Sequence, residues 1–175
     1  MFGAKESFLS DLAYSAWANQ LLLDGCTALT AEEMERDLGV SHPHILATLR
    51  HVCDGEKIWL ECLSMTPDAG TWRLPMGKAP VLSLDELRQE WPPVWDGYKH
   101  WLKGFPEQGL QAEIKVSMED SMAPRLERWK ILRHVLDHST FHRGQMVGMI
   151  RNLGKVPPAI NRMDYWLVTS DKSAS

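Results

Sequence analysis

The chain has 175 residues, enough for one domain with a substantial hydrophobic core. Its 44% apolar and 24% charged residues are ordinary for a globular protein, and a formal net charge of −4 argues against a nucleic-acid partner, which usually needs a basic surface. Because no segment approaches the roughly 18 consecutive apolar residues of a membrane span, and the N-terminus lacks a signal-peptide pattern, we expect a cytoplasmic protein without a membrane partner.

Apolar residues spaced three and four apart predict a first helix over residues 5–26. Thr30 and Glu33 then have the spacing of a capping box, in which each side chain bonds the other residue's backbone N–H. This pair predicts the start of a short helix. Pro43 suits the first turn of the next long helix, which we expect over residues 43–64.

A loop is expected over residues 65–82, which are rich in proline and glycine. Ser83 and Glu86 form a second capping box and predict the start of a third long helix. Pro92 and Pro93 lie inside this helix. They should kink or split it, because proline lacks the backbone N–H and clashes with the preceding turn.

A short strand is predicted over residues 111–118, where apolar and polar residues alternate. A turn leads to a partner strand expected near residues 125–128, which would complete a minor β-hairpin. The last long helix is expected over residues 129–152, before a glycine and two prolines. Residues 163–168 should pack back on the body as a strand or helix, and residues 171–175 should form a frayed tail.

These segments predict an all-α fold, a four-helix bundle in a single domain over residues 1–170. We find no internal repeat and no linker that would divide the chain. The three cysteines, Cys26, Cys53 and Cys62, have no C-x-x-C spacing. We therefore expect them to be buried, reduced thiols rather than a disulfide framework or a zinc site.

Three histidines at intervals of four residues, His134, His138 and His142, are the most informative feature of the chain. A step of four residues returns to nearly the same face of a helix, roughly 6 Å further along. Neutral imidazole is the commonest protein ligand for transition metals, so a neighbouring pair could hold one ion. The outer two lie roughly 12 Å apart, too far to share an ion easily. His138 belongs to either pair, and spacing alone does not choose its partner.

A catalytic metal site usually has three protein ligands and one open position, so a third ligand must come from another helix. His51 is the best candidate because it lies mid-helix among apolar residues. His42 and His44 lie at a helix start, and His100 lies between charged Lys99 and apolar Trp101, so both regions are expected to be more exposed. Interpretations without a metal stay open: His51 as a hydrogen-bonded core residue, and the three later histidines as a solvated polar stripe.

Other chemistries have less support in the sequence. There is no glycine-rich phosphate loop and no G-x-S-x-G motif. No glutamate lies between His138 and His142, so the base of an H-E-x-x-H peptidase is absent. Glu56 and Glu61 do not supply the Glu-x-x-His pairs of a di-iron bundle. Arg143 fits a structural ion pair and a substrate anchor equally well.

Taken together, the segments resemble the DinB/YfiT-like family of metal-dependent enzymes. The strongest likeness is LRHVLDHSTFHRGQMVGMIRNLG, which resembles the last bundle helix of that family. The segment LRHVCDGEKIWLECL resembles the helix that carries its first ligand, and LAYSAWANQLLLDGC resembles its opening helix. The likeness covers nearly the whole chain in the right order, and H-x-x-x-H-R-G-Q is its most specific part.

The resemblance implies a four-helix bundle with up-down-down-up connectivity and a divalent metal ion, most often nickel or zinc, held by three histidines. Carried over by position, these ligands are His51, His138 and His142, and His134 becomes a neighbouring polar residue. The resemblance also implies S-transferase-like or isomerase-like chemistry with a low-molecular-weight thiol, and a homodimer.

We therefore expect a metal-dependent transferase or hydrolase-like enzyme that acts on a small-molecule substrate, either a thiol or an electrophile. Arg143, Trp17, Trp59 and Phe141 are the expected pocket residues. The alternative is a non-catalytic metal-binding or stress-related scaffold protein. A third interpretation is an interaction bundle whose histidines are merely polar.

Overall fold

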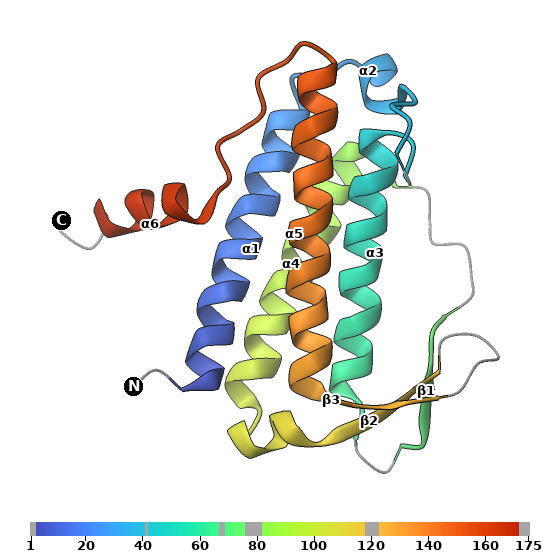
Figure 1. Cartoon of the computed structure of the whole chain (residues 1–175), viewed down its shortest axis with the longest axis vertical. Helices are drawn as coiled ribbons and strands as arrows, with labels where there is room; N and C mark the ends of the chain where they lie inside the picture. Colours follow the sequence, from blue (N-terminus) through green and yellow to red (C-terminus); the bar gives the residue numbers. More distant parts are fainter. Residues whose placement is uncertain (1–2, 41, 67–68, 76–81, 118–122, 172–175) are drawn as a thin grey trace.

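The computed structural model describes residues 3–40, 42–66, 69–75, 82–117 and 123–171. Over these residues the protein is mostly helical, with one small sheet at one end of the long helices (Figure 1). The turn expected inside the hairpin lies almost wholly outside the described residues, as does all but the first residue of the expected tail. Within the described ranges, no helix combines the length and apolar character of a membrane span.

Four long helices lie side by side and surround one core (Figure 1). Helices α1 and α3 each contact both α4 and α5. Their bounds agree to within two residues with those that the sequence analysis gave. They are α1 (Ala4–Cys26), α3 (Ile45–Ser64), α4 (Leu84–Gly104) and α5 (Arg128–Asn152).

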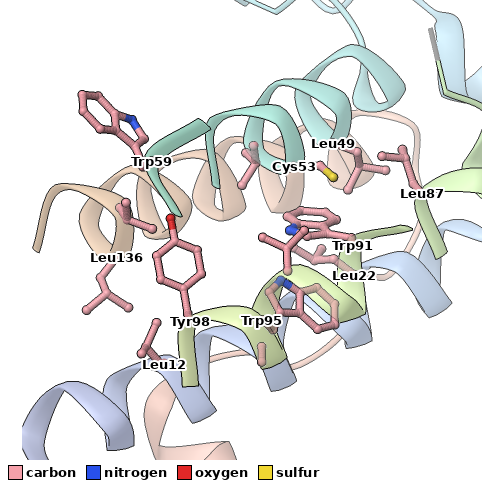
Figure 2. Close-up of a cluster of buried hydrophobic side chains, with 14 of the residues drawn as sticks. Leu12, Leu22, Leu49, Cys53, Trp59, Leu87, Trp91, Trp95, Tyr98 and Leu136 are labelled. Atoms are coloured by element: carbon pink, nitrogen blue, oxygen red, sulfur yellow. The ribbon is translucent and has the colours of Figure 1, made fainter. Parts of the chain in front are cut away.

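The core consists of the apolar faces of these four helices. Figure 2 shows Trp91, Trp95 and Tyr98 of α4 directed into the space between α1 and α3. They lie among fully buried aliphatic side chains such as Leu22 of α1 and Leu49 of α3. Since burying one large apolar side chain contributes roughly 1.5–3 kcal/mol, this core fixes how α3 and α5 lie beside each other.

The two capping boxes form as predicted and set the starts of α2 and α4. The Thr30 hydroxyl accepts from the Glu33 backbone N–H at 3.2 Å, and the Glu33 carboxylate accepts from the Thr30 N–H at 2.9 Å. Ser83 and Glu86 make the same reciprocal pair, at 3.3 and 2.7 Å. Short sequence signals therefore determine where these helices begin.

Pro92 and Pro93 do not split α4, which is one continuous helix. Their missing N–H groups leave the carbonyls of Arg88 and Gln89 without helical donors. Both of these residues are exposed, so water can bond their carbonyls. The buried face of α4 passes uninterrupted from Trp91 onward, and its packing outweighs the local cost of the prolines.

Three shorter helical elements are present in the described part of the chain. They are α2 (Ala31–Glu35), the 3-10 helix η1 (Glu107–Gln111) and α6 (Arg162–Asp171). Gly154 adopts a φ of 74°, the left-handed conformation that commonly ends a helix, and follows α5. Of the two forms expected for the C-terminal segment, the helix is the one present.

The predicted hairpin is present and carries a third strand. β2 (Glu113–Ser117) pairs antiparallel with β3 (Arg125–Glu127), and β1 (Thr71–Arg73) pairs parallel with the other edge of β2. The expectation of a loop throughout residues 65–82 was therefore wrong at β1. A strand of three residues shows no alternation to detect, and its partner strand and the buried Trp72 hold it in place.

All three cysteines are free and buried, as predicted. Loss of hydration on burial disfavours the thiolate and raises the pKa of Cys26, Cys53 and Cys62 to about 12 in each case. The thiols are therefore protonated at neutral pH and serve as small apolar side chains of the core.

Candidate metal centre

The imidazoles of α3 and α5 meet between the two helices. His51 Nε2 and His138 Nε2 are 2.9 Å apart. The His142 ring centroid lies 4.8 Å from that of His51 and 4.5 Å from that of His138. The structure thus brings together the three histidines that the sequence analysis assigned as ligands.

Helical spacing and burial explain this convergence. His138 and His142 are one turn apart on α5, and buried Val135 and Met146 continue the same helix toward the core. His142 is only 5% exposed, whereas His138 and His51 are half-buried. The rings therefore lie at the boundary between the core and the protein surface, where His51 and His138 are partly exposed.

A fourth imidazole, that of His42, lies at the same point and was not expected there. Its ring stacks on His51 with 3.8 Å between centroids, and ring nitrogens of His42, His51 and His142 all lie within 4.8 Å of one another, a group that has His42 in the place of the expected His138. The Thr48 hydroxyl donates to the His42 carbonyl at 3.4 Å, which ties the segment before α3 to its first turn. His42 is half-buried, more enclosed than a helix start suggests.

His44 has a different role although it is only two residues away. Its Nδ1 accepts from the Ala47 backbone N–H at 3.0 Å, so it caps α3. The helix therefore begins at Ile45, after Pro43 rather than with it. His100 is exposed on α4, as expected.

Burial favours the neutral form of the His51 and His138 rings at pH 7. Loss of hydration, and after it the nearby His42 and His142, lower the pKa of His51 to about 4. The same cause, followed by the neighbouring histidines, lowers the pKa of His138 to about 3. The neutral ring is the form that binds a metal, because its unprotonated nitrogen carries the lone pair.

Gln145 orients His142. The His142 Nδ1 lies 2.8 Å from the Gln145 Oε1. A carboxamide oxygen only accepts, so Nδ1 carries the proton and Nε2 is left with a free lone pair. Such a hydrogen bond to the second ring nitrogen is typical of metal-binding histidines, and it accounts for the glutamine of the H-R-G-Q element.

The donor set fits a divalent transition-metal ion. Such ions bind imidazole nitrogen at about 2.0–2.1 Å, so two nitrogen ligands of one ion lie roughly 3–3.4 Å apart, the longer value at the tetrahedral angle that zinc prefers. The 2.9 Å between the Nε2 atoms of His51 and His138 is close to that separation. Neutral nitrogen ligands suit zinc and nickel, whereas magnesium and calcium prefer oxygen.

Three other expected pocket residues border the cluster. The His134 ring lies 5.6 Å from the His138 ring, and Trp59 meets His134 edge to face at 5.2 Å. Phe141 is 63% exposed and meets His142 edge to face at 5.1 Å. The border of the centre is therefore largely aromatic.

The structure places Arg143 and Trp17 elsewhere. Arg143 is 2% exposed and donates to the Ser15 hydroxyl at 2.8 Å and to the Asn19 carbonyl oxygen at 3.0 Å, both on α1. Trp17 contacts Tyr165 of α6, with 5.4 Å between ring centroids. Arg143 thus joins α5 to α1 as a structural residue, and Trp17 belongs to the contact between α1 and α6.

A buried carboxylate lies behind the cluster, and the sequence analysis assigned it no role. Glu56 of α3 follows His51 by five residues, and burial raises its pKa against the opposing effect of its hydrogen bonds. Ser139, one of its partners, directly follows His138 on α5, so this network ties α3 to α5 beside the centre. The groups that donate to Glu56 are Asn19 Nδ2 (3.2 Å), Trp91 Nε1 (2.6 Å), Trp95 Nε1 (3.0 Å) and Ser139 Oγ (2.5 Å).

Comparison with known proteins agrees with this arrangement of helices. Residues 3–172 match the model of the DinB family. The chain belongs to the DinB family. It is 21% identical over 164 residues to Protein DinB of Bacillus subtilis (strain 168), covering 92% of this chain and 94% of that one.

A solved structure shows the same DinB-like fold. The crystal structure of a DinB-like protein from Bacillus cereus ATCC 10987 superposes with a TM-score of 0.69 at 19% sequence identity. The match covers 92% of this chain and all of the other. At such identity the likeness concerns the helical fold, and the function must be argued from the site itself.

Proposed function

We propose that this DinB-family protein is an enzyme that depends on a divalent metal ion, nickel or zinc, held by His51, His138 and His142. Its substrate is a small thiol or an electrophile. The observation that carries the proposal is the 2.9 Å contact between His51 and His138 beside a His142 whose Nε2 is left free by Gln145. The up-down-down-up connectivity belongs to the same proposal and is supported by the course of the four long helices in Figure 1.

Three neutral ligands leave a bound ion its full charge of +2, which lowers the pKa of a thiol or water molecule on it. The protein's own part is to hold the three rings in place and, through burial, to favour the neutral form of His51 and His138. Rigid helices supply all three, and the Glu56–Ser139 hydrogen bond fixes α3 against α5 next to them. Phe141 and Trp59 give the border of the centre an aromatic, apolar surface.

Replacing one proposed ligand tests the assignment directly. We expect the wild-type protein to retain about one equivalent of nickel or zinc after dialysis, and His138→Ala to retain less than about a tenth of that. Elemental analysis measures the content, and His100→Ala, an exposed histidine of α4, is the matched control. Full metal content in His138→Ala would show that the assignment is wrong.

His42 favours a second candidate function, a non-catalytic metal-binding protein. Structural metal sites tend to be closed by four protein ligands, whereas catalytic sites keep a position for water. His42 lies close enough to His51 and His142 to act as a fourth ligand. A site closed by four imidazoles would suit a store, a sensor or a stabilised scaffold better than an enzyme.

Loading the wild-type and His42→Ala proteins with cobalt(II) distinguishes the two candidate functions. If the protein is an enzyme with three histidine ligands, the cobalt affinity and visible absorption spectrum of His42→Ala should match those of the wild type. An added thiol should then alter the spectrum of each protein. If four histidines close the site, removal of His42 should lower the cobalt affinity at least about 10-fold and change the absorption spectrum. An added thiol should then leave the spectrum of the wild-type protein unchanged. His44→Ala, which lacks only a helix cap, is the control.

A further inference from the structure

An apolar pocket opens beside the histidine cluster, between α3, α5 and the small sheet. Its volume is about 330 Å³. Trp59 forms one wall, Val116 and Leu126 of the sheet form another, and Ile131 and His134 of α5 complete it. Neither the proposed ligands nor their hydrogen-bond partners line it, so the metal centre does not by itself account for this space.

His134 joins the pocket to the metal centre. Its exposed ring touches Trp59 on one side, at 5.2 Å, and His138 on the other, at 5.6 Å between centroids. Among the residues that the structure describes, none makes a hydrogen bond to the His134 ring nitrogens. A ligand in the pocket therefore meets a free polar group on the path toward His138.

The charges around the pocket select an uncharged occupant. Lys130, the one cation of the described lining, forms an ion pair with Glu127 at 2.6 Å. Trp59 stacks on Trp72 with 5.4 Å between ring centroids, which makes this wall flat and aromatic. A flat apolar wall without a free charge favours an aromatic ring or a branched hydrocarbon group.

We propose that this pocket binds the apolar group of the substrate, a single aromatic ring or branched hydrocarbon chain that a short linker joins to the reactive thiol. A cavity of about 150 Å³ suffices for benzene, so 330 Å³ admits a phenyl ring and several linker atoms. His134 and His138 are one helical turn apart, about 6 Å, which sets a linker of roughly three atoms. The position of the thiol rests on the proposed function, whereas the pocket itself does not.

A larger hollow at the far end of α5 does not compete for this role. It has a volume of about 580 Å³ and lies under the connection between α5 and α6. Arg151, Lys155 and Asp164 are part of its lining, and no histidine is among its described lining residues. Its charged border and its distance along α5 from the imidazoles separate it from the proposed chemistry.

Binding of an alcohol to metal-free protein tests the pocket independently of any metal. We expect 3-phenylpropan-1-ol to bind EDTA-treated wild-type protein at least about 10-fold more tightly than propan-1-ol in a calorimetric titration. Leu126→Trp, which fills the pocket from the sheet, should abolish this preference. Leu21→Trp is the control, because Leu21 lines the apolar hollow beside Trp17 instead. An unchanged preference in Leu126→Trp would overturn the proposal.

Cobalt-loaded protein tests the link between pocket and metal centre. We expect 3-phenylpropane-1-thiol to produce a thiolate-to-cobalt absorption band at about one tenth of the concentration that propane-1-thiol requires. Leu126→Trp should lose this advantage and keep its cobalt. If cobalt does not bind, the proposed function fails and the alcohol titration still decides on the pocket. If cobalt and both thiols bind with equal affinity, the pocket proposal fails alone.

Circular dichroism should confirm that Leu126→Trp is folded, because tryptophan is well tolerated in strands. Ile131→Phe fills the pocket from the opposite wall and should remove the same preference. If both variants lose the preference for the phenyl compound, the preference depends on the pocket that both substitutions fill. Retention of the preference in both folded variants would show that phenyl groups bind elsewhere.

Discussion

At the scale of single residues, Glu56 is the side chain whose chemistry is most tightly specified. Both of its oxygens face N–H donors: Asn19 donates to one, and Trp91 and Trp95 donate to the other. Glutamine has the same shape but replaces one acceptor oxygen with an NH₂ group. Whichever way its amide turns, an N–H group faces another N–H group in a buried site.

We therefore expect Glu56→Gln to lower the free energy of unfolding by about 3 kcal/mol, the scale of a buried donor left without its partner. Urea denaturation followed by circular dichroism measures the change. Glu90→Gln is the control, because Glu90 forms a partly exposed ion pair with Lys57 and should lose less than about 1 kcal/mol. Equal losses in the two variants would contradict the role assigned to Glu56.

His42 and Glu56 also show what the sequence could not reveal about single residues. Spacing along α5 predicts that His138 lies one turn from His142, because helix geometry is local. The position of His42 depends on how the segment before α3 folds onto the Thr48 hydroxyl, and that of Glu56 depends on donors from three other helices. The H-P-H sequence before the helix of His51 was the only hint for His42.

At the scale of elements, α4 accommodates two prolines that should weaken it. Proline costs about 3 kcal/mol relative to alanine inside a helix, partly offset because it also restricts the unfolded chain. Pro93 is exposed, so its replacement removes no buried contact. We expect Pro93→Ala to raise the free energy of unfolding by about 1–2 kcal/mol in urea denaturation.

Pro157→Ala provides the comparison for that prediction. Pro157 follows α5 outside any helix, so its replacement relieves no helical clash and only frees the unfolded chain. It should leave stability unchanged or slightly reduced. If the free energy of unfolding of Pro93→Ala is no higher than that of Pro157→Ala, then Pro93 does not destabilise α4.

Elements with a local signal were predictable, and those that depend on a partner were not. The long helices and the starts of α2 and α4 follow from apolar periodicity and capping boxes. β1 has only three residues and exists because β2 offers it a parallel edge. The apolar pocket likewise needs one wall from the sheet and another from α5, so no single segment predicts it.

At the scale of the whole molecule, the proposed metal centre couples two helices that are distant in sequence. His51 lies on α3, and His138 lies 87 residues later on α5. Unfolding separates them, so an ion that binds both should bind the native state far better than the unfolded chain. The resemblance to the family predicted the order of the helices along the chain. The coupling between metal binding and folding follows instead from the positions of the His51 and His138 rings.

Added metal should therefore raise the melting temperature of the EDTA-treated protein. At a metal concentration 100 times the dissociation constant, the native state gains about 2.7 kcal/mol, which for a domain of this size corresponds to roughly 5–10 °C. Zinc or nickel should produce this shift in a calorimetric scan. Magnesium should not, because it prefers oxygen ligands. His138→Ala should show no shift with any of the three. If neither zinc nor nickel changes the melting temperature of the wild-type protein, the result would instead support a bundle whose histidines are merely polar.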